Sequence, residues 1–119
     1  MKKTLCFILC LAIVVSFSAT AFACDACFNG ATSVFFRIGT VSEDGNNLRL
    51  REHHNTTYGD IYGQLYTGNT MRVAKKWEDT SATWYYVKVL TANDPINVGL
   101  QCWVAGINGS DVNVTLSFG

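Results

Sequence analysis

The sequence predicts an all-β protein that folds as one small barrel or sandwich. Seven short runs alternate apolar and polar residues with a period of two, which is typical of half-buried strands. Segments rich in Gly, Asn, Asp and Pro separate these runs, as in "EDGNN" (43–47) and "TANDP" (91–95). After residue 23, no stretch shows a convincing helical period with caps.

The strands are expected, in chain order, at residues 33–41, 48–51, 61–66, 70–77, 84–90, 98–106 and 112–118. The first run is rich in β-branched and aromatic residues, the second alternates strictly, and the others place apolar residues two apart. Seven closely spaced strands in so short a chain favour a small barrel or sandwich.

Parity divides the later strands into two faces. Tyr85, Val87 and Val89 share one face of the run 84–90, and Trp84, Tyr86 and Lys88 share the other. Leu100, Cys102 and Val104 likewise share a face, which we assign to the core, and Trp103 points to the opposite side.

Residues 1–23 have the pattern of an export signal. Lys2 and Lys3 precede the uncharged apolar run 5–17, which is shorter than the ~20 residues that span a bilayer. Ala21 and Ala23 are small residues at the −3 and −1 positions of a signal-peptidase site, so we expect cleavage before Cys24. A lipid on Cys24 or a retained anchor are the alternatives; otherwise no membrane association is expected.

Removal of residues 1–23 takes away two of the nine basic residues and leaves seven against nine acidic ones, a net charge of −2. This near-neutral chain has no basic face for nucleic acid and no polybasic segment for anionic lipid. The 96 remaining residues are enough for one domain with a modest core. Residues 24–33 are small and polar and are expected to form an irregular lead that carries Cys24 and Cys27.

Several motifs in residues 38–106 follow one another in a distinctive order: "GTVSEDGNNLRLRE", a polar loop ending at Tyr58, "IYGQLYTGNT", "WYYVKV" and "GLQCWVAG". In order and spacing this part of the chain resembles a bacterial SH3-type domain. The chain departs from the family pattern at residues 52–54, where Glu-His-His replaces a serine-glycine-proline segment, and at Cys102, where the family has glycine. The resemblance implies an SH3-like β-barrel over residues 34–119, with an additional C-terminal strand.

The resemblance also implies a function: recognition of cell-wall (peptidoglycan) peptides by a secreted or cell-envelope-associated, non-catalytic module. The alternative is a small secreted interaction or inhibitor domain that uses the same aromatic face on a protein partner. A redox or metal protein built on "CDAC" (24–27) is a third possibility.

No enzymatic activity, cofactor or metal is expected. The only histidines, His53 and His54, are adjacent, and neighbouring side chains on an extended backbone point to opposite sides. There is no phosphate-binding glycine loop before a helix, and the acidic residues are scattered over turns.

The candidate ligand-binding residues are aromatic: Tyr58, Trp84 and Trp103. Outward aromatic rings offer rigid contact area with a polar tip, which suits peptide recognition. In a barrel this small, loops and the tail can instead cover the two tryptophans, and the sequence leaves both alternatives open.

Three cysteines remain after the predicted cleavage: Cys24, Cys27 and Cys102. Export places them in an oxidising setting. We favour a disulfide between Cys27 and Cys102, because closing a long loop constrains the unfolded chain most. The alternatives are a local clip from Cys24 to Cys27, and a buried free thiol at Cys102, as parity suggests.

Overall fold

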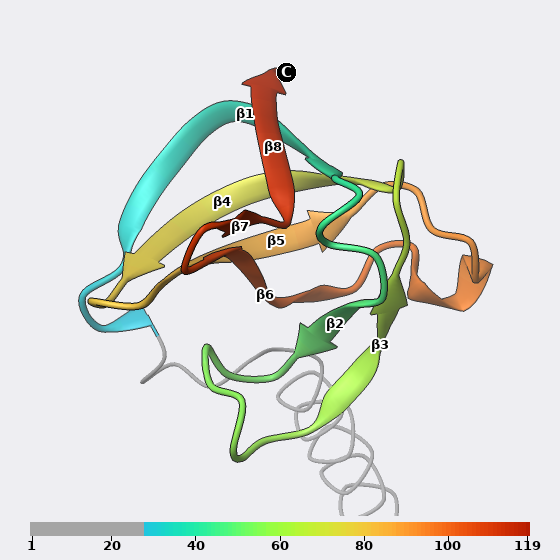
Figure 1. Ribbon diagram of the computed structural model, residues 1–119. Helices are drawn as coiled ribbons and strands as arrows, with labels where there is room; N and C mark the ends of the chain where they lie inside the picture. The colour runs from blue at the N-terminus through green and yellow to red at the C-terminus, as the bar shows by residue number, and fades with distance from the viewer. Residues whose placement is uncertain (1–27) are drawn as a thin grey trace, which may run out of the picture.

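The computed structural model describes residues 28–119, which form an all-β, barrel-like fold with a strand added at the C-terminal end, as the sequence predicts (Figure 1). The strands are β1 (Thr32–Val41), β2 (Leu48–Arg51), β3 (Ile61–Leu65), β4 (Thr70–Glu78), β5 (Ala82–Val89), β6 (Gln101–Asn108), β7 (Asp111–Val112) and β8 (Val114–Phe118).

All the strands belong to one antiparallel sheet, in the order β3-β2-β6-β5-β4-β1-β8, with β7 paired to β6. β4, β5 and β6 form a meander of consecutive neighbours, whereas β1 pairs both with β4 and with β8, the last strand of the chain. The sheet curls so that β1 and β8 arch over β4 and β5 (Figure 1).

The predicted strands all occur. Five of the seven begin and end within two residues of the prediction, and the other two differ more. The predicted strand 98–106 begins only at Gln101, because Pro95–Asn97 form the short 3₁₀ helix η2, capped by the side chain of Asp94. The predicted strand 112–118 is divided at Asn113. The side-chain nitrogen Nδ2 of Asn113 donates to the Ala105 carbonyl at 3.0 Å. The chain therefore leaves β6 at this point and turns to β1.

The face assigned to the core by parity is the core. Tyr85, Val87 and Val89 of β5 pack with Cys102 and Val104 of β6. We call the whole buried set the aliphatic core; its other members are Val41, Leu48, Leu50, Leu65, Met71, Val73 and Val114.

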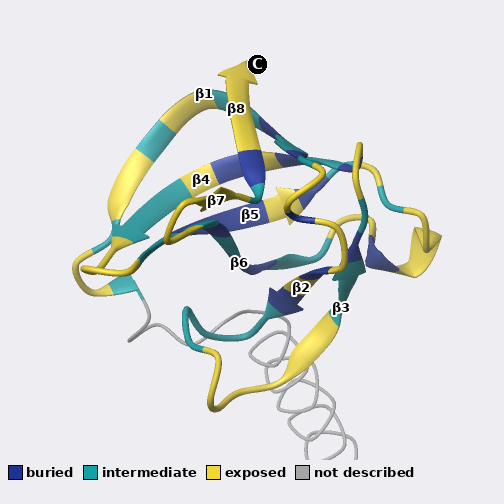
Figure 2. Cartoon of the chain, viewed as in Figure 1, coloured by how far each residue is buried: buried dark blue, intermediate teal, exposed yellow. Residues whose placement is uncertain are grey.

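A second buried group lies on the opposite face of β5 and β6 and consists of Trp84, Tyr86 and Trp103. We call it the aromatic cluster. Phe28, Ala31, Trp77, Ala82 and Ala105 pack against it. The prediction that the tryptophans lie opposite the core is therefore confirmed. Trp103, with an exposed fraction of 0%, is covered. Figure 2 shows the resulting dark, buried stretch along β5 and β6.

Cys102 is completely buried in the aliphatic core and forms no disulfide within residues 28–119. Burial in this apolar setting raises the pKa of the thiol to about 12. Cys24 and Cys27 lie outside the described residues, so the pairing of Cys27 with Cys102 stays a prediction.

The predicted signal peptide (1–23) and its cleavage site also lie outside the described residues. Within residues 28–119, no helix has the length and apolar character needed to cross a membrane.

Candidate functional site

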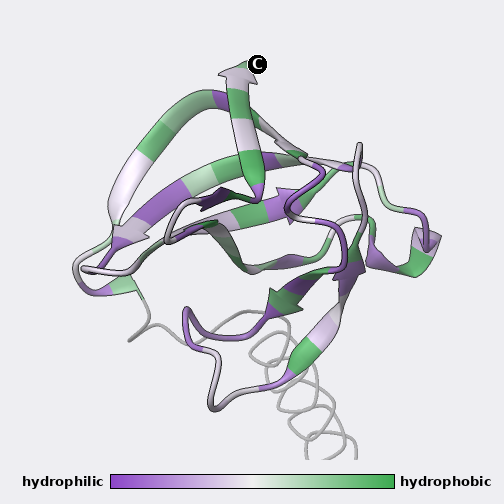
Figure 3. Cartoon of the chain, in the orientation of Figure 1, coloured by the Kyte–Doolittle hydropathy of each residue, from purple (hydrophilic) through white to green (hydrophobic). Residues whose placement is uncertain are grey.

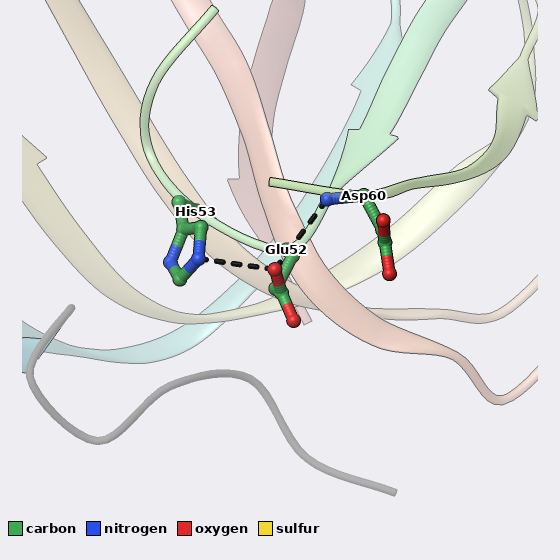
Figure 4. A network of polar contacts seen from close by, with 3 residues as sticks. All are labelled: Glu52, His53 and Asp60. Atoms are coloured by element: carbon green, nitrogen blue, oxygen red, sulfur yellow. Dashed lines mark hydrogen bonds and ion pairs between the residues drawn. The ribbon is translucent and has the colours of Figure 1, made fainter. Parts of the chain in front are cut away.

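The loop between β2 and β3 (residues 52–60) is held closed at its base. The backbone N–H of Glu52 donates to the Asp60 carbonyl at 2.9 Å. The Glu52 carboxylate oxygen Oε1 lies 3.0 Å from His53 Nε2 and accepts from the Asp60 N–H at 3.4 Å (Figure 4). One carboxylate thus ties both ends of the loop together, so its tip is presented in a defined position.

The two adjacent histidines point apart, as their alternation predicts. The ring of His53 lies beside Tyr58, with 5.1 Å between centroids. The ring of His54 stacks on Trp77 at 3.9 Å and meets Trp103 edge-on at 5.0 Å. His54 therefore anchors the loop to the aromatic cluster. Among residues 28–119, no three His, Cys, Asp or Glu side chains lie close enough to hold a metal ion.

The tip of the loop is shaped by its own side chains. Asn55 Oδ1 accepts from the backbone N–H of Thr57 at 2.7 Å and from its hydroxyl at 2.6 Å, an Asx turn. Gly59 has a φ of 91°, and a Cβ there would lie 2.5 Å from the His53 ring. Only glycine therefore fits both the backbone angle and the space beside His53.

The turn between β4 and β5 faces this loop. Asp79 Oδ1 accepts from the backbone N–H groups of Ser81 and Ala82, both at 2.7 Å, and from the Ser81 hydroxyl at 3.0 Å. These backbone hydrogen bonds, joined by that of the Ser81 hydroxyl and by a minor contribution from His54, lower the pKa of the Asp79 carboxyl. Asp79 is therefore a carboxylate at neutral pH.

A cleft of about 300 Å³ lies between the loop and the turn, and we call it the polar cleft. One wall consists of residues 54–57 and the other of the β4–β5 turn with Asp79 and Ser81. The rest of the lining is Ala82, Trp84, Ala105 and Asn108. The lining is mainly polar, so the cleft presents amide, hydroxyl and carboxylate groups beside the ring of one tryptophan.

The structure places the three predicted aromatic residues differently. Trp84 is mostly buried but lines the polar cleft. Tyr58, at 62% exposure, lies on the same loop but outside the lining. Trp103 lies within the aromatic cluster, and its buried indole N–H has no hydrogen-bond acceptor among the described residues. Of the three, only Trp84 is thus brought into the cleft.

Sequence reasoning missed the polar residues of the cleft, above all Asp79, Ser81 and Asn108. Their signal is turn chemistry: "EDTSA" (78–82) places an acidic acceptor before a serine, and "INGS" (107–110) contains the dipeptide Asn-Gly. Both stretches have the composition of turns, and nothing in one turn shows that another lies opposite it.

Comparison with known proteins finds no match: neither a family model, nor a curated protein, nor a solved structure is similar to this chain. Any function must therefore be argued from the residues themselves.

Proposed function

We propose that the protein is an exported, non-catalytic binding module that recognises cell-wall (peptidoglycan) peptides in the polar cleft. The carrying observation is the cleft itself, where an ionised carboxylate, two side-chain amides and three hydroxyls surround the edge of Trp84. Peptides of the cell wall carry backbone amides and free amino groups, and these are the groups that such a lining can pair with.

Asp79 is the proposed anchor for the amino group. All three of its hydrogen bonds from the turn go to Oδ1, which fixes the orientation of the carboxylate. A charge-assisted hydrogen bond from an ammonium group to a carboxylate is stronger than a neutral one. The edge of Trp84 that borders the cleft supplies apolar contact for the aliphatic part of the peptide.

The absence of catalysis is part of the proposal. The hydroxyls of Thr57 and Ser81 donate to the side chains of Asn55 and Asp79, so they stabilise the two turns. The ring of His54 stacks on Trp77. Because each group already supports the walls of the cleft, its best supported role is to hold shape.

The resemblance of residues 38–106 to bacterial SH3-type domains supports the proposed ligand, and the export signal expected at residues 1–23 supports a secreted or envelope-associated location. A lipid on Cys24 would place the same module on a membrane surface.

The test is co-sedimentation with purified peptidoglycan sacculi, before and after an amidase has removed the peptides. We expect binding to intact sacculi only. Asp79→Asn keeps an acceptor oxygen for the turn and should weaken binding about tenfold, which corresponds to one charge-assisted hydrogen bond. The matched control is Asp111→Asn on β7, outside the cleft. Equal binding to both sacculi preparations would contradict the proposal.

A second candidate is an interaction or inhibitor domain for a protein partner. Tyr58 on the loop and Ile61 and Tyr62 at the start of β3 are exposed, and β3 lies at one end of the sheet order. An edge strand with exposed apolar side chains can receive a strand from a partner. Tyr58→Ala together with Ile61→Ser should abolish binding of this kind and leave binding to sacculi intact.

A further inference from the structure

A second hollow lies between the first half of β1 and β4. Its volume is about 400 Å³, and its lining is mainly apolar, with Val34, Phe35, Phe36, Ile38 and Val73 among its residues. This volume is within the ~300–1,000 Å³ range of ligand pockets. It shares no lining residue with the polar cleft, so a ligand here is independent of the proposed function.

An irregularity of β1 creates the hollow. The register of β1 against β4 shifts between Ser33 and Arg37, so the strand bulges at this point. Phe36 has a φ of 56°, a left-handed conformation that is costly for a bulky side chain. Figure 1 shows the resulting arch of β1 above β4. Strain of this kind clusters at functional sites and is a reason to look for a ligand.

The bulge exposes two consecutive aromatic rings. Phe35 is 71% exposed and Phe36 79% exposed. The first half of β1 is largely yellow (exposed) in Figure 2 and includes green (hydrophobic) bands in Figure 3. Apolar surface gathered at a strained bulge beside a hollow marks a binding surface more strongly than single exposed side chains do.

Positive charge borders the same hollow. Arg37 and Arg72 both belong to its lining. The Arg37 guanidinium lies 3.9 Å from the centre of the Phe118 ring. Arg72 on β4 lies directly opposite Lys88 on β5, a pair of like charges that destabilises a sheet. In the described part of the chain, neither arginine forms an ion pair.

We propose that this hollow binds an amphiphilic anion, a molecule with an unbranched apolar chain and a single carboxylate. The chain would lie along Val34, Phe36 and Ile38, and the carboxylate would pair with the guanidinium of Arg72. An anion at this position offsets the repulsion between Arg72 and Lys88, and the apolar chain covers the exposed rings. A ligand with an apolar chain and one carboxylate would thus match the apolar lining and the arginine at its border.

The probe is decanoate at monomeric concentration, titrated into the protein and followed by calorimetry and by backbone amide shifts. Decanoate should bind, with the largest shifts at residues 33–38 and 72–74. Decanol has the same chain without the charge and should bind at least tenfold more weakly, and decyltrimethylammonium should not bind. Vesicles of phosphatidylglycerol form a separate arm, because an anionic lipid surface has the same chemistry.

Arg72→Gln should weaken decanoate binding about tenfold, because it removes a charge-assisted pair. Arg49→Gln is the matched control, since Arg49 is an exposed strand arginine outside the hollow. Phe36→Gly suits the positive φ and removes the ring, so it should reduce binding while the circular dichroism spectrum is unchanged. Decanol binding as tightly as decanoate, an unaffected Arg72→Gln, or binding to vesicles alone would each overturn the proposal.

Discussion

The aliphatic core and the aromatic cluster lie on the two faces of the same strands, yet they are covered in different ways. Val87 of β5 pairs with Cys102 of β6 on the core side, and the next pair, Tyr86 with Trp103, lies on the other side. Strands from the whole sheet close over the core. The aromatic cluster is covered by Phe28 and Ala31 before β1 and by Trp77 of β4, and His54 of the loop lies against Trp103. A strand pattern thus identifies two faces, but what covers each face is decided elsewhere in the chain.

The largest expected effect tests how tightly the core side is sealed. At pH 8 the Cys102 thiol should react with iodoacetamide at least about a thousandfold more slowly in the native protein than after unfolding. The thiolate is the reactive form, and burial raises the thiol pKa from 9.0 to about 12. Mass spectrometry of labelled peptides measures the two rates.

Labelling also decides the predicted disulfide. If Cys102 stays unlabelled in denaturant without reductant, and a peptide joining Cys27 to Cys102 is recovered, the disulfide prediction is correct and the free thiol is not.

The second effect tests whether the aromatic cluster is as important for stability as the core. Trp103→Ala should lower the free energy of unfolding by about 3–5 kcal/mol, the range for a buried tryptophan. Leu50→Ala in the aliphatic core is the comparison and should cost about 2–5 kcal/mol. Urea denaturation measures both. A loss below about 0.5 kcal/mol for Trp103→Ala is typical of a surface substitution. Such a result would show that the aromatic cluster does not stabilise the fold as the aliphatic core does.

The third effect concerns the close approach of Gly106 to the aliphatic core. A Cβ at Gly106 would lie 2.1 Å from Tyr85 Cε2, so Gly106→Ala must displace a buried ring. We expect a loss of about 1–3 kcal/mol in urea denaturation, the usual cost of overpacking. Gly68→Ala is a control for backbone strain alone, since Gly68 has a positive φ but open space around it.

The smallest effect belongs to the turn that borders the aromatic cluster and the polar cleft. Hydrogen bonds lower the pKa of Asp79 in the folded state, so its stabilising contribution is present above the unfolded pKa of about 3.8. The contribution is lost as the pH falls through the lower folded value. Asp79→Asn should therefore melt at a slightly lower temperature at pH 7, and the difference should shrink as the pH falls below 3.8. A difference that is independent of pH would show that ionisation of Asp79 has no part in it.

The strands and their faces could be predicted because alternation is a local property. Alternation within the run 84–90 is enough to place Tyr85 and Val87 on one face and Trp84 and Tyr86 on the other. The cover of the aromatic side could not be predicted in the same way. Phe28 lies in a lead that was expected to be irregular, and nothing local links it to Trp103.

The polar cleft shows the same limit. Asn55 lies on the β2–β3 loop, Asp79 in the β4–β5 turn and Asn108 at the end of β6, and only the fold brings them to one place. Sequence reasoning pointed to the aromatic residues because their chemistry is conspicuous. Of these candidates, Trp84 lines the cleft and Trp103 lies in the aromatic cluster.

The pairing of β1 with β8 has a consequence for how the chain folds. Thr40 lies opposite Thr115, so β1 pairs with a strand that is 75 residues further along the chain. In contrast, β4, β5 and β6 can form hairpins with their immediate neighbours. Contacts between distant residues slow folding, because the loop must close before they contribute. We therefore expect the β4–β6 meander to form early and the docking of β8 to be the slow, final step. Until then one edge of β1 remains open to pairing with another chain.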